Sequence, residues 1–217
     1  MLTYLLAYRL TCSTQDAVQK YGRATNATIP LYESDLVAMI RSRGNHPSIV
    51  QWETFNEQDC YGVFVTPPHS VADVVALARR TDWQGRPVDT DSGGGANYDA
   101  AGDVNDVHSY PYPGNPLPSA HKYAMIGEFG GIGTFTRGKE WVPRKCFTYL
   151  PVNSSQLMAE TYVNMTARMV RDHIPRGLAS SIYTQVCARA WAMCTGNVHG
   201  HVHVHVGLEG SPSPHPH

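Results

Sequence analysis

The sequence predicts an α/β fold in which strands and helices alternate along the chain. Amphipathic segments at residues 33–43, 70–80 and 154–173 alternate with runs rich in β-branched and aromatic residues. Gly- and Pro-rich stretches separate these segments. This order favours a parallel sheet, because consecutive parallel strands need a crossover connection that a helix usually supplies.

The three predicted helices are defined by apolar spacing and by stop signals. Residues 70–80 carry apolar side chains at i, i+3, i+4 and i+7, namely Val71, Val74, Val75 and Ala78. The helix at 33–43 is expected to start with Ser34 or Asp35 as its cap. The helix at 154–173 is the longest, and the following proline and glycine are expected to stop it.

Five short runs with β-forming composition are the predicted strands. In chain order they are residues 48–55, 86–90, 103–109, 122–127 and 178–184. No internal repeat is visible. The first 14 or so residues are hard to assign, and the His-rich residues 199–217 do not have the pattern of a packed element.

The 217-residue chain has the composition of a globular protein. Hydrophobic residues make up 42%, charged residues 16%, and 17 basic against 18 acidic residues give a formal net charge of −1. This balance gives no electrostatic reason to expect a nucleic acid or an anionic membrane as partner. No run approaches the ~20 apolar residues that span a bilayer. We therefore expect neither kind of partner.

Two glutamates stand at the ends of predicted strands. Glu57 follows the strand at 48–55, and Glu128 follows the strand at 122–127. The carboxyl ends of parallel strands converge on one face, so these side chains can meet. Two carboxylates there could flank a glycosidic bond, one protonating the leaving oxygen and the other attacking the anomeric carbon. A lone glutamate in this position is more often a solvated loop residue, and both interpretations remain open on spacing alone.

Four motifs, in this order, resemble those of glycoside hydrolase family 2, which contains β-galactosidases, β-glucuronidases and β-mannosidases. Residues 43–57 (RGNHPSIVQWETFNE) resemble its acid/base signature, and residues 103–111 (DVNDVHSYP) resemble its sixth-strand motif. Residues 126–131 (IGEFGG) resemble its nucleophile motif, and residues 183–185 (YTQ) resemble the start of strand eight in a β-galactosidase-like subgroup. The resemblance covers about residues 15–185.

The resemblance implies a retaining β-glycosidase with Glu57 as acid/base and Glu128 as nucleophile. The implied substrate-binding residues are Asn56, His108, Tyr110, Asp91 and Ser92. Among them, Asn56 would bind the sugar 2-hydroxyl, Tyr110 would orient the nucleophile and His108 would line the sugar pocket. Each also has a structural interpretation: a turn cap for Asn56, a loop-shaping role for Tyr110 and a buried core histidine for His108. The resemblance implies no cofactor, and no residues that would fix a metal ion are found.

The resemblance also implies a (β/α)₈ TIM barrel, here truncated. If residues 56–57 end strand four, 55 residues precede them, whereas three βα units need about ninety. We therefore expect roughly strands three or four to eight within residues 15–185, an unplaced segment at 1–14 and a divergent, low-complexity tail at 186–217. A homo-oligomer or a partner that supplies the missing half is expected beside the carbohydrate substrate.

Two alternatives remain open. The chain could be an inactive fragment that binds carbohydrate without turnover. Separately, the tail alternates so that His201, His203 and His205 would share one strand face and could hold zinc or nickel. A disordered extension is the simpler interpretation of the tail. For the sugar, the strand-eight motif favours a galactoside, followed by a glucuronide and then a mannoside.

Overall fold

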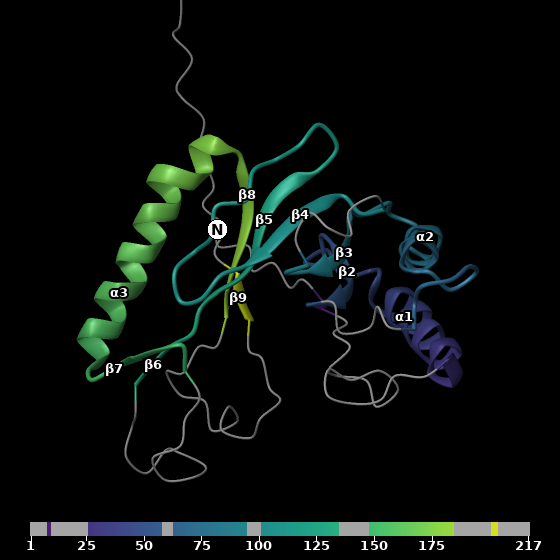
Figure 1. The fold of residues 1–217 in the computed structure, drawn as a ribbon, viewed down its shortest axis with the longest axis horizontal. Helices are drawn as coiled ribbons and strands as arrows, with labels where there is room; N and C mark the ends of the chain where they lie inside the picture. Colours follow the sequence, from purple (N-terminus) through teal and green to yellow (C-terminus); the bar gives the residue numbers. More distant parts are fainter. Residues whose placement is uncertain are drawn as a thin grey trace, which may run out of the picture.

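In the computed structural model, the described residues are 8–9, 26–57, 63–94, 101–134, 148–184 and 201–203. They form strands that alternate with helices, as the sequence pattern predicts (Figure 1). Apart from 8–9 and 201–203, the two unplaced ends of the chain lie outside the described residues. None of the described helices combines the length and apolarity that a bilayer crossing requires.

The elements fall into two groups along the chain. The first contains β1 (Tyr8–Arg9), a 3₁₀ turn (Asn26–Thr28), α1 (Ile29–Arg43), β2 (Trp52–Asn56), α2 (Val71–Thr81) and β3 (Val88–Ser92). The second contains β4 (Val104–His108), β5 (Tyr123–Gly130), β6 (Ile132–Thr134), β7 (Leu150–Val152), α3 (Ser155–Arg168), a π turn (Met169–His173), a 3₁₀ turn (Ile174–Arg176), β8 (Leu178–Thr184) and β9 (His201–His203). Helices α1 and α2 lie on the side of β2 and β3, and α3 lies on the opposite side of the molecule (Figure 1).

The described strands belong to three sheets. One sheet has the order β1-β2-β3 with parallel pairing throughout. The second has the order β4-β5-β8-β9, in which β4, β5 and β8 are parallel and β9 is antiparallel to β8. The third is the short parallel pair β6-β7. The predicted parallel strands are thus present, with the bounds of the last one, 178–184, reproduced in full.

The predicted TIM barrel is wrong for the described part of the chain. Its strands do not close into a ring, and three α-helices accompany them, whereas a (β/α)₈ barrel has a helix after each of eight strands. Closure also requires parallel neighbours on both sides of each strand, but the antiparallel β9 pairs with β8. Between β3 and β4, the Asp103 carboxylate accepts the Val88 N–H at 2.8 Å, so a side chain takes a donor that a strand ladder would use.

The helices differ from their predicted limits at the ends. Helix α1 starts at Ile29, before the predicted caps, because proline in the first turn has a helical φ and lacks only an N–H that the helix does not need. Helix α2 begins as predicted, with Ser70 at its N-cap. The third helix is α-helical to Arg168 and then continues as the π and 3₁₀ turns. Gly177 ends it with φ 99°, a conformation that glycine adopts readily.

Two large apolar cores support the two groups of elements, and a third, smaller cluster contains Val104, Met125 and Ile182. The first packs α1 and α2 against β2 and β3, and its aromatic centre is Tyr32, Phe55 and Phe64, whose ring centroids lie 5.1–5.4 Å apart. The second packs α3 and the π turn against β5 and β8 through Met165 and Met169. These cores hold the strand ends, where the candidate site residues lie.

Candidate active site

The strand register brings the predicted site residues to neighbouring positions. Asn56 pairs with Ser92 across β2 and β3, and His108 pairs with Glu128 across β4 and β5. The register shifts between Val107 and His108, and this irregularity places His108 opposite Glu128. Within each of the two sheets, the carboxyl ends of adjacent parallel strands form one edge, which is why residues far apart in sequence meet there. The contact of Ser92 with His108 connects the two edges.

Glu57, His108 and Glu128 form the centre of the candidate site. Nδ1 of His108 lies 2.8 Å from Oε1 of Glu57 and 3.5 Å from Oε2 of Glu128. An oxygen of one glutamate lies within 4.8 Å of an oxygen of the other. The side chains of His108 and Glu128 are 8% and 6% exposed, whereas that of Glu57 is 33% exposed. The two strand-end glutamates therefore meet in space, while their chemical roles stay predictions.

The backbone of Glu57 is in a conformation that L-residues seldom adopt. In the described part of the chain, it is the one non-glycine residue with positive φ, at 51°. Its N–H donates to the Ser92 carbonyl at 2.9 Å, which fixes the turn directly after β2. Such strained residues concentrate at functional sites, because the surrounding structure holds a side chain in a required direction.

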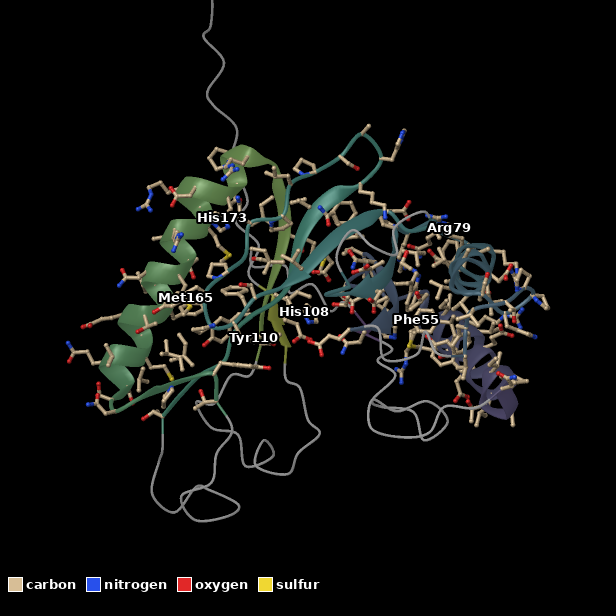
Figure 2. The ribbon with its side chains drawn as sticks, in the orientation of Figure 1. Phe55, Arg79, His108, Tyr110, Met165 and His173 are labelled. Atoms are coloured by element: carbon tan, nitrogen blue, oxygen red, sulfur yellow. The ribbon has the colours of Figure 1, made fainter. Side chains whose placement is uncertain are left out.

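Tyr110 holds Glu128 from another side. Its hydroxyl contacts Oε2 of Glu128 and Oγ1 of Thr184, and its ring stacks on Tyr149 with centroids 3.8 Å apart. A hydroxyl donor to a carboxylate supports the ionised form of that carboxylate. Figure 2 shows Tyr110 and His108 near each other, between α3 and the α1–α2 side of the molecule. The sequence analysis did not include Tyr149, and it included Thr184 as part of the strand-eight motif without a role in the site. No local motif marks the stacking contact.

The remaining predicted substrate contacts are more deeply buried. Asn56 is 7% exposed, and its Oδ1 has no hydrogen-bond partner within the described residues. Asp91 is buried, and the pKa of the Tyr32 phenol is raised first by burial and then by the charge of Asp91. Ser92 is 1% exposed, and its hydroxyl bonds to Asp106 and His108. Substrate contact by these three residues stays a prediction.

Asp106 is a buried member of the site that sequence reasoning did not select. It lies two residues before His108 on β4, so the two-residue period of a strand places both on the same face. Asp106 is 2% exposed and accepts hydrogen bonds from Ser92 Oγ at 2.9 Å and from the Gly127 N–H. Strand periodicity was therefore the signal that could have identified it.

Two glycines allow the close contacts around His108 and Asp106. A Cβ on Gly93 would lie 2.4 Å from the imidazole of His108, and one on Gly127 would lie 2.1 Å from an Asp106 oxygen. Gly93 also has φ 77°, which a residue with a side chain seldom adopts. The side chains of His108 and Asp106 thus occupy the space that a side chain at position 93 or 127 would need.

Asp89 and Glu53 extend this acidic region into the interior. Asp89 and Glu53 are 2% and 1% exposed. Burial, followed by the charges of Asp106 and Glu53, holds the pKa of Asp89 well above its ordinary value. Asp89 is therefore the member of this group for which the structure shows that the neutral form is favoured.

Two groups of three side chains place potential metal-ligand atoms within 4.8 Å of one another in the described residues. They are Glu57, His108 and Glu128, and Glu53, Asp89 and Asp106. In the first group His108 already contacts a glutamate at hydrogen-bond distance, and in the second Asp106 accepts hydrogen bonds from the protein. We interpret both groups as hydrogen-bonded networks and assign no metal to either.

Comparisons with known proteins give structural neighbours alone. No protein-family model and no curated protein matches the chain. Faecalibacterium prausnitzii β-glucuronidase is 20% identical, with 71% of this chain and 28% of that one covered at a TM-score of 0.42. A β-glucuronidase of Bacteroides uniformis is 15% identical, with 75% and 22% covered at 0.47, and a candidate β-galactosidase of Bacteroides fragilis is 19% identical, with 75% and 25% covered at 0.46.

These neighbours are glycosidases, and the similarity is weak and partial. The chain spans 22–28% of the length of the three proteins. At these identities and TM-scores, the similarity assigns neither a substrate nor a reaction. The function therefore has to be argued from the site itself.

Proposed function

We propose that this chain carries the catalytic carboxylates of a retaining β-glycosidase resembling glycoside hydrolase family 2, with a β-galactoside as the first candidate substrate. The observation that carries the proposal is the approach of Glu57 and Glu128 oxygens to within 4.8 Å. Retaining enzymes separate their carboxyl groups by ~5–5.5 Å, whereas inverting enzymes need ~6.5–9.5 Å to admit a water molecule. The spacing supports direct attack by a carboxylate.

The surroundings of the two glutamates support different roles for them. Glu128 is nearly buried and receives the Tyr110 hydroxyl, which favours an ionised nucleophile. Glu57 is the more exposed of the pair, as a group that exchanges protons with a leaving group and with water should be. Asn56 precedes Glu57 and is proposed to bind the sugar 2-hydroxyl.

The proposed reaction has two steps. In the first, a Glu128 oxygen attacks the anomeric carbon, the glycosidic C–O bond breaks, and Glu57 gives its proton to the leaving oxygen. In the second, water attacks the anomeric carbon and gives a proton to Glu57, and the bond to Glu128 breaks. The sugar leaves with its original anomeric configuration.

Covalent labelling tests this proposal on the chain as it exists. The purified protein is incubated with 2-deoxy-2-fluoro-β-galactosyl fluoride and its mass is measured, with Glu128→Gln as the matched control. We expect an adduct of one sugar on the wild type and none on Glu128→Gln. The glucosyl, glucuronyl and mannosyl reagents identify the sugar in the same way.

Failure of all four reagents, with a sample shown by circular dichroism to be folded, would contradict the proposed nucleophile. Titration of such a sample with galactose, followed by NMR, then tests the alternative of a carbohydrate-binding chain without turnover. Shifts confined to residues around Glu57 and Glu128 would support that alternative.

A further inference from the structure

A pocket of about 690 Å³ lies at the starts of strands β3, β4 and β5, whereas the candidate active site lies at strand ends. Pro87, Asp103 and Lys122 line it, and each directly precedes one of these strands. Figure 2 shows Arg79, which also lines the pocket, apart from His108 of the candidate active site. Its volume is within the range of ~300–1,000 Å³ that is typical of small-molecule sites.

Arg79 presents hydrogen-bond donors to this pocket. Its Nη2 donates to Oδ1 of Asp103 at 2.8 Å, and within the described residues this is the hydrogen bond that its side chain makes. The other oxygen of Asp103 accepts the Val88 N–H at 2.8 Å, so both oxygens of this carboxylate are engaged. A guanidinium has five N–H donors, and the Arg79 side chain is 44% exposed. Asp103 therefore orients Arg79 while leaving other N–H groups available to a ligand.

The turn before β5 adds two further donors. The Ser119 N–H donates to the Lys122 carbonyl at 2.9 Å, and the His121 N–H donates to Ser119 Oγ at 3.4 Å. Ser119 Oγ is an acceptor in this contact, so its own proton remains available to a ligand. The exposed imidazole of His121 carries at least one N–H donor in either protonation state.

The positive charges at the pocket are only partly neutralised. Arg86 is paired with buried Asp82 at 2.9 Å, so its charge is already balanced. Burial lowers the pKa of Lys122, the charge of Asp89 opposes this shift, and the charge of Arg79 adds to it. Lys122 and Arg79 therefore repel each other across the pocket. A bound anion would relieve this repulsion.

The remaining lining residues limit the kind of anion. Asp103 is the one acid among the residues that line the pocket, and its oxygens already accept hydrogen bonds. Donors therefore outnumber available side-chain acceptors. The rings of Pro87 and Pro118 supply apolar wall, and the volume exceeds what a bare oxyanion would fill. The lining thus fits a charged group attached to a carbon body.

We propose that this pocket is a second ligand site that takes a small organic anion, whose carboxylate or phosphate group is bound by Arg79, Ser119 and His121. This inference is independent of the proposed glycosidase function. Arg79 belongs to the first group of elements, and Ser119 and His121 belong to the second. A bound anion therefore bridges the two groups where β3 lies next to β4.

Titration of the ¹⁵N-labelled full chain, followed by ¹H–¹⁵N correlation spectra at pH 7 and constant salt, tests the site. The probes are phenyl phosphate and benzoate, with benzyl alcohol as the neutral control. None of them is a glycoside, so the result does not depend on the candidate active site. We expect both acids to shift the amide signals of Arg79 and of residues 119–123 in a saturable way, with about millimolar affinity. The amides of Glu57 and Glu128 should not shift.

Two outcomes of this titration would overturn the proposal. One is the absence of saturable shifts at Arg79 and residues 119–123 with either acid. The other is binding of benzyl alcohol as tight as that of the acids, because the site would then recognise the ring and not the charge. Tighter binding of phenyl phosphate or of benzoate identifies which charged group the site prefers.

A pair of neighbouring arginines separates local donors from net charge. Arg79→Gln should weaken phenyl phosphate binding by roughly 10–100-fold, because it removes charged hydrogen bonds. Arg80→Gln makes the same change at the next, exposed residue of α2, outside the pocket lining, and should have less than about a 2-fold effect. Ser119→Ala keeps the pair between Arg79 and Asp103 and should weaken binding by roughly 2–10-fold. Equal weakening by both arginine variants would refute the site.

Hydrogen exchange tests the bridging role. At a phenyl phosphate concentration ten times its Kd, openings that release the ligand should become about 10-fold rarer. We expect slower exchange at Val88, in the first group of elements, and at Tyr123, in the second. Slower exchange in one group alone would show that the anion binds without bridging and would contradict that part of the proposal.

Discussion

Asp89 lies next to two other buried acids, and its protonation makes stability depend on pH. Its pKa is raised by burial first and by the charges of Asp106 and Glu53 second. Such a group contributes stability that is fully present below its unfolded-state pKa, near 3.8, and is lost as pH rises through its higher folded-state pKa. The raised value therefore predicts that the free energy of unfolding falls as pH increases above about 4.

The substitution Asp89→Asn should remove this loss of stability at higher pH, because asparagine does not ionise. We expect the variant to gain stability relative to wild type as pH rises from 4.5 to 8, as measured by urea unfolding at several pH values. Asp172→Asn is a control of opposite sign, because the hydrogen bond from Arg171 lowers the pKa of Asp172, so that its contribution is present at neutral pH and lost in acid. An Asp89→Asn difference that is constant over this range would contradict the raised pKa.

At the residue scale, the sequence identifies the two carboxylates of the candidate site but not the residues that contact them. The sequence predicts that Glu57 and Glu128 follow two strands, because each closes a β-forming run. It contains no sign that Ser92, from another strand, would lie between Asp106 and His108. The hydrogen-bond partners of a side chain depend on contacts between strands, and the sequence of one segment does not specify them.

At the scale of elements, helix α2 shows close agreement between local sequence and structure. Ser70 Oγ accepts the Asp73 N–H at 3.3 Å, and the Asp73 carboxylate accepts the Ser70 N–H at 2.9 Å. This reciprocal capping satisfies two backbone donors that the helix leaves free. The apolar stripe then buries Val74, Val75 and Ala78 in the first core.

Ser70→Ala should destabilise the protein by about 1 kcal/mol, because it removes the acceptor at the N-cap of α2. Thermal or urea unfolding measures the change. Ser155→Ala, at an exposed first-turn position of α3, is the matched control and should be within about 0.5 kcal/mol of wild type. Equal effects of the two substitutions would show that the capping hydrogen bonds contribute little.

The shortest strands could not be predicted from the local sequence. Strands β1, β6 and β7 have two or three residues each and were not predicted, and the three-residue β9 lies in the tail for which a strand was only one of two alternatives. Each exists through pairing with another strand, such as β9 with β8. Segments of this length are too short to show a two-residue hydrophobic period.

At the scale of the whole molecule, the two groups of elements are joined where β3 lies next to β4. The first core includes Leu36 of α1, which is fully buried, and the second centres on α3, β5 and β8. The described links across the boundary include Asp103 N–H to the Val88 carbonyl at 2.9 Å and the Ser92 side-chain contacts. This division predicts that the two halves differ in local stability.

Leu36→Ala should cost about 2–5 kcal/mol by leaving a cavity in the first core. We expect hydrogen exchange to accelerate most in α1, α2, β2 and β3, and less in β5 and β8. Leu31→Ala on the same helix is the control, since Leu31 is 53% exposed, and should alter exchange little. Equal acceleration of hydrogen exchange in both groups of elements would show that they unfold together as one cooperative unit, and it would contradict this prediction.

The sequence by itself determined the alternation of elements, the helix stop and capping signals of α2, and the placement of two glutamates at strand ends. These features depend on period and on residue type over a few positions, which a single chain segment contains. The open arrangement of three sheets, the meeting of Glu57 with Glu128, and the path from Asp106 through Ser92 and His108 were decided by tertiary structure alone. Register and pairing partners depend on contacts between segments, so they become defined when the strands come together.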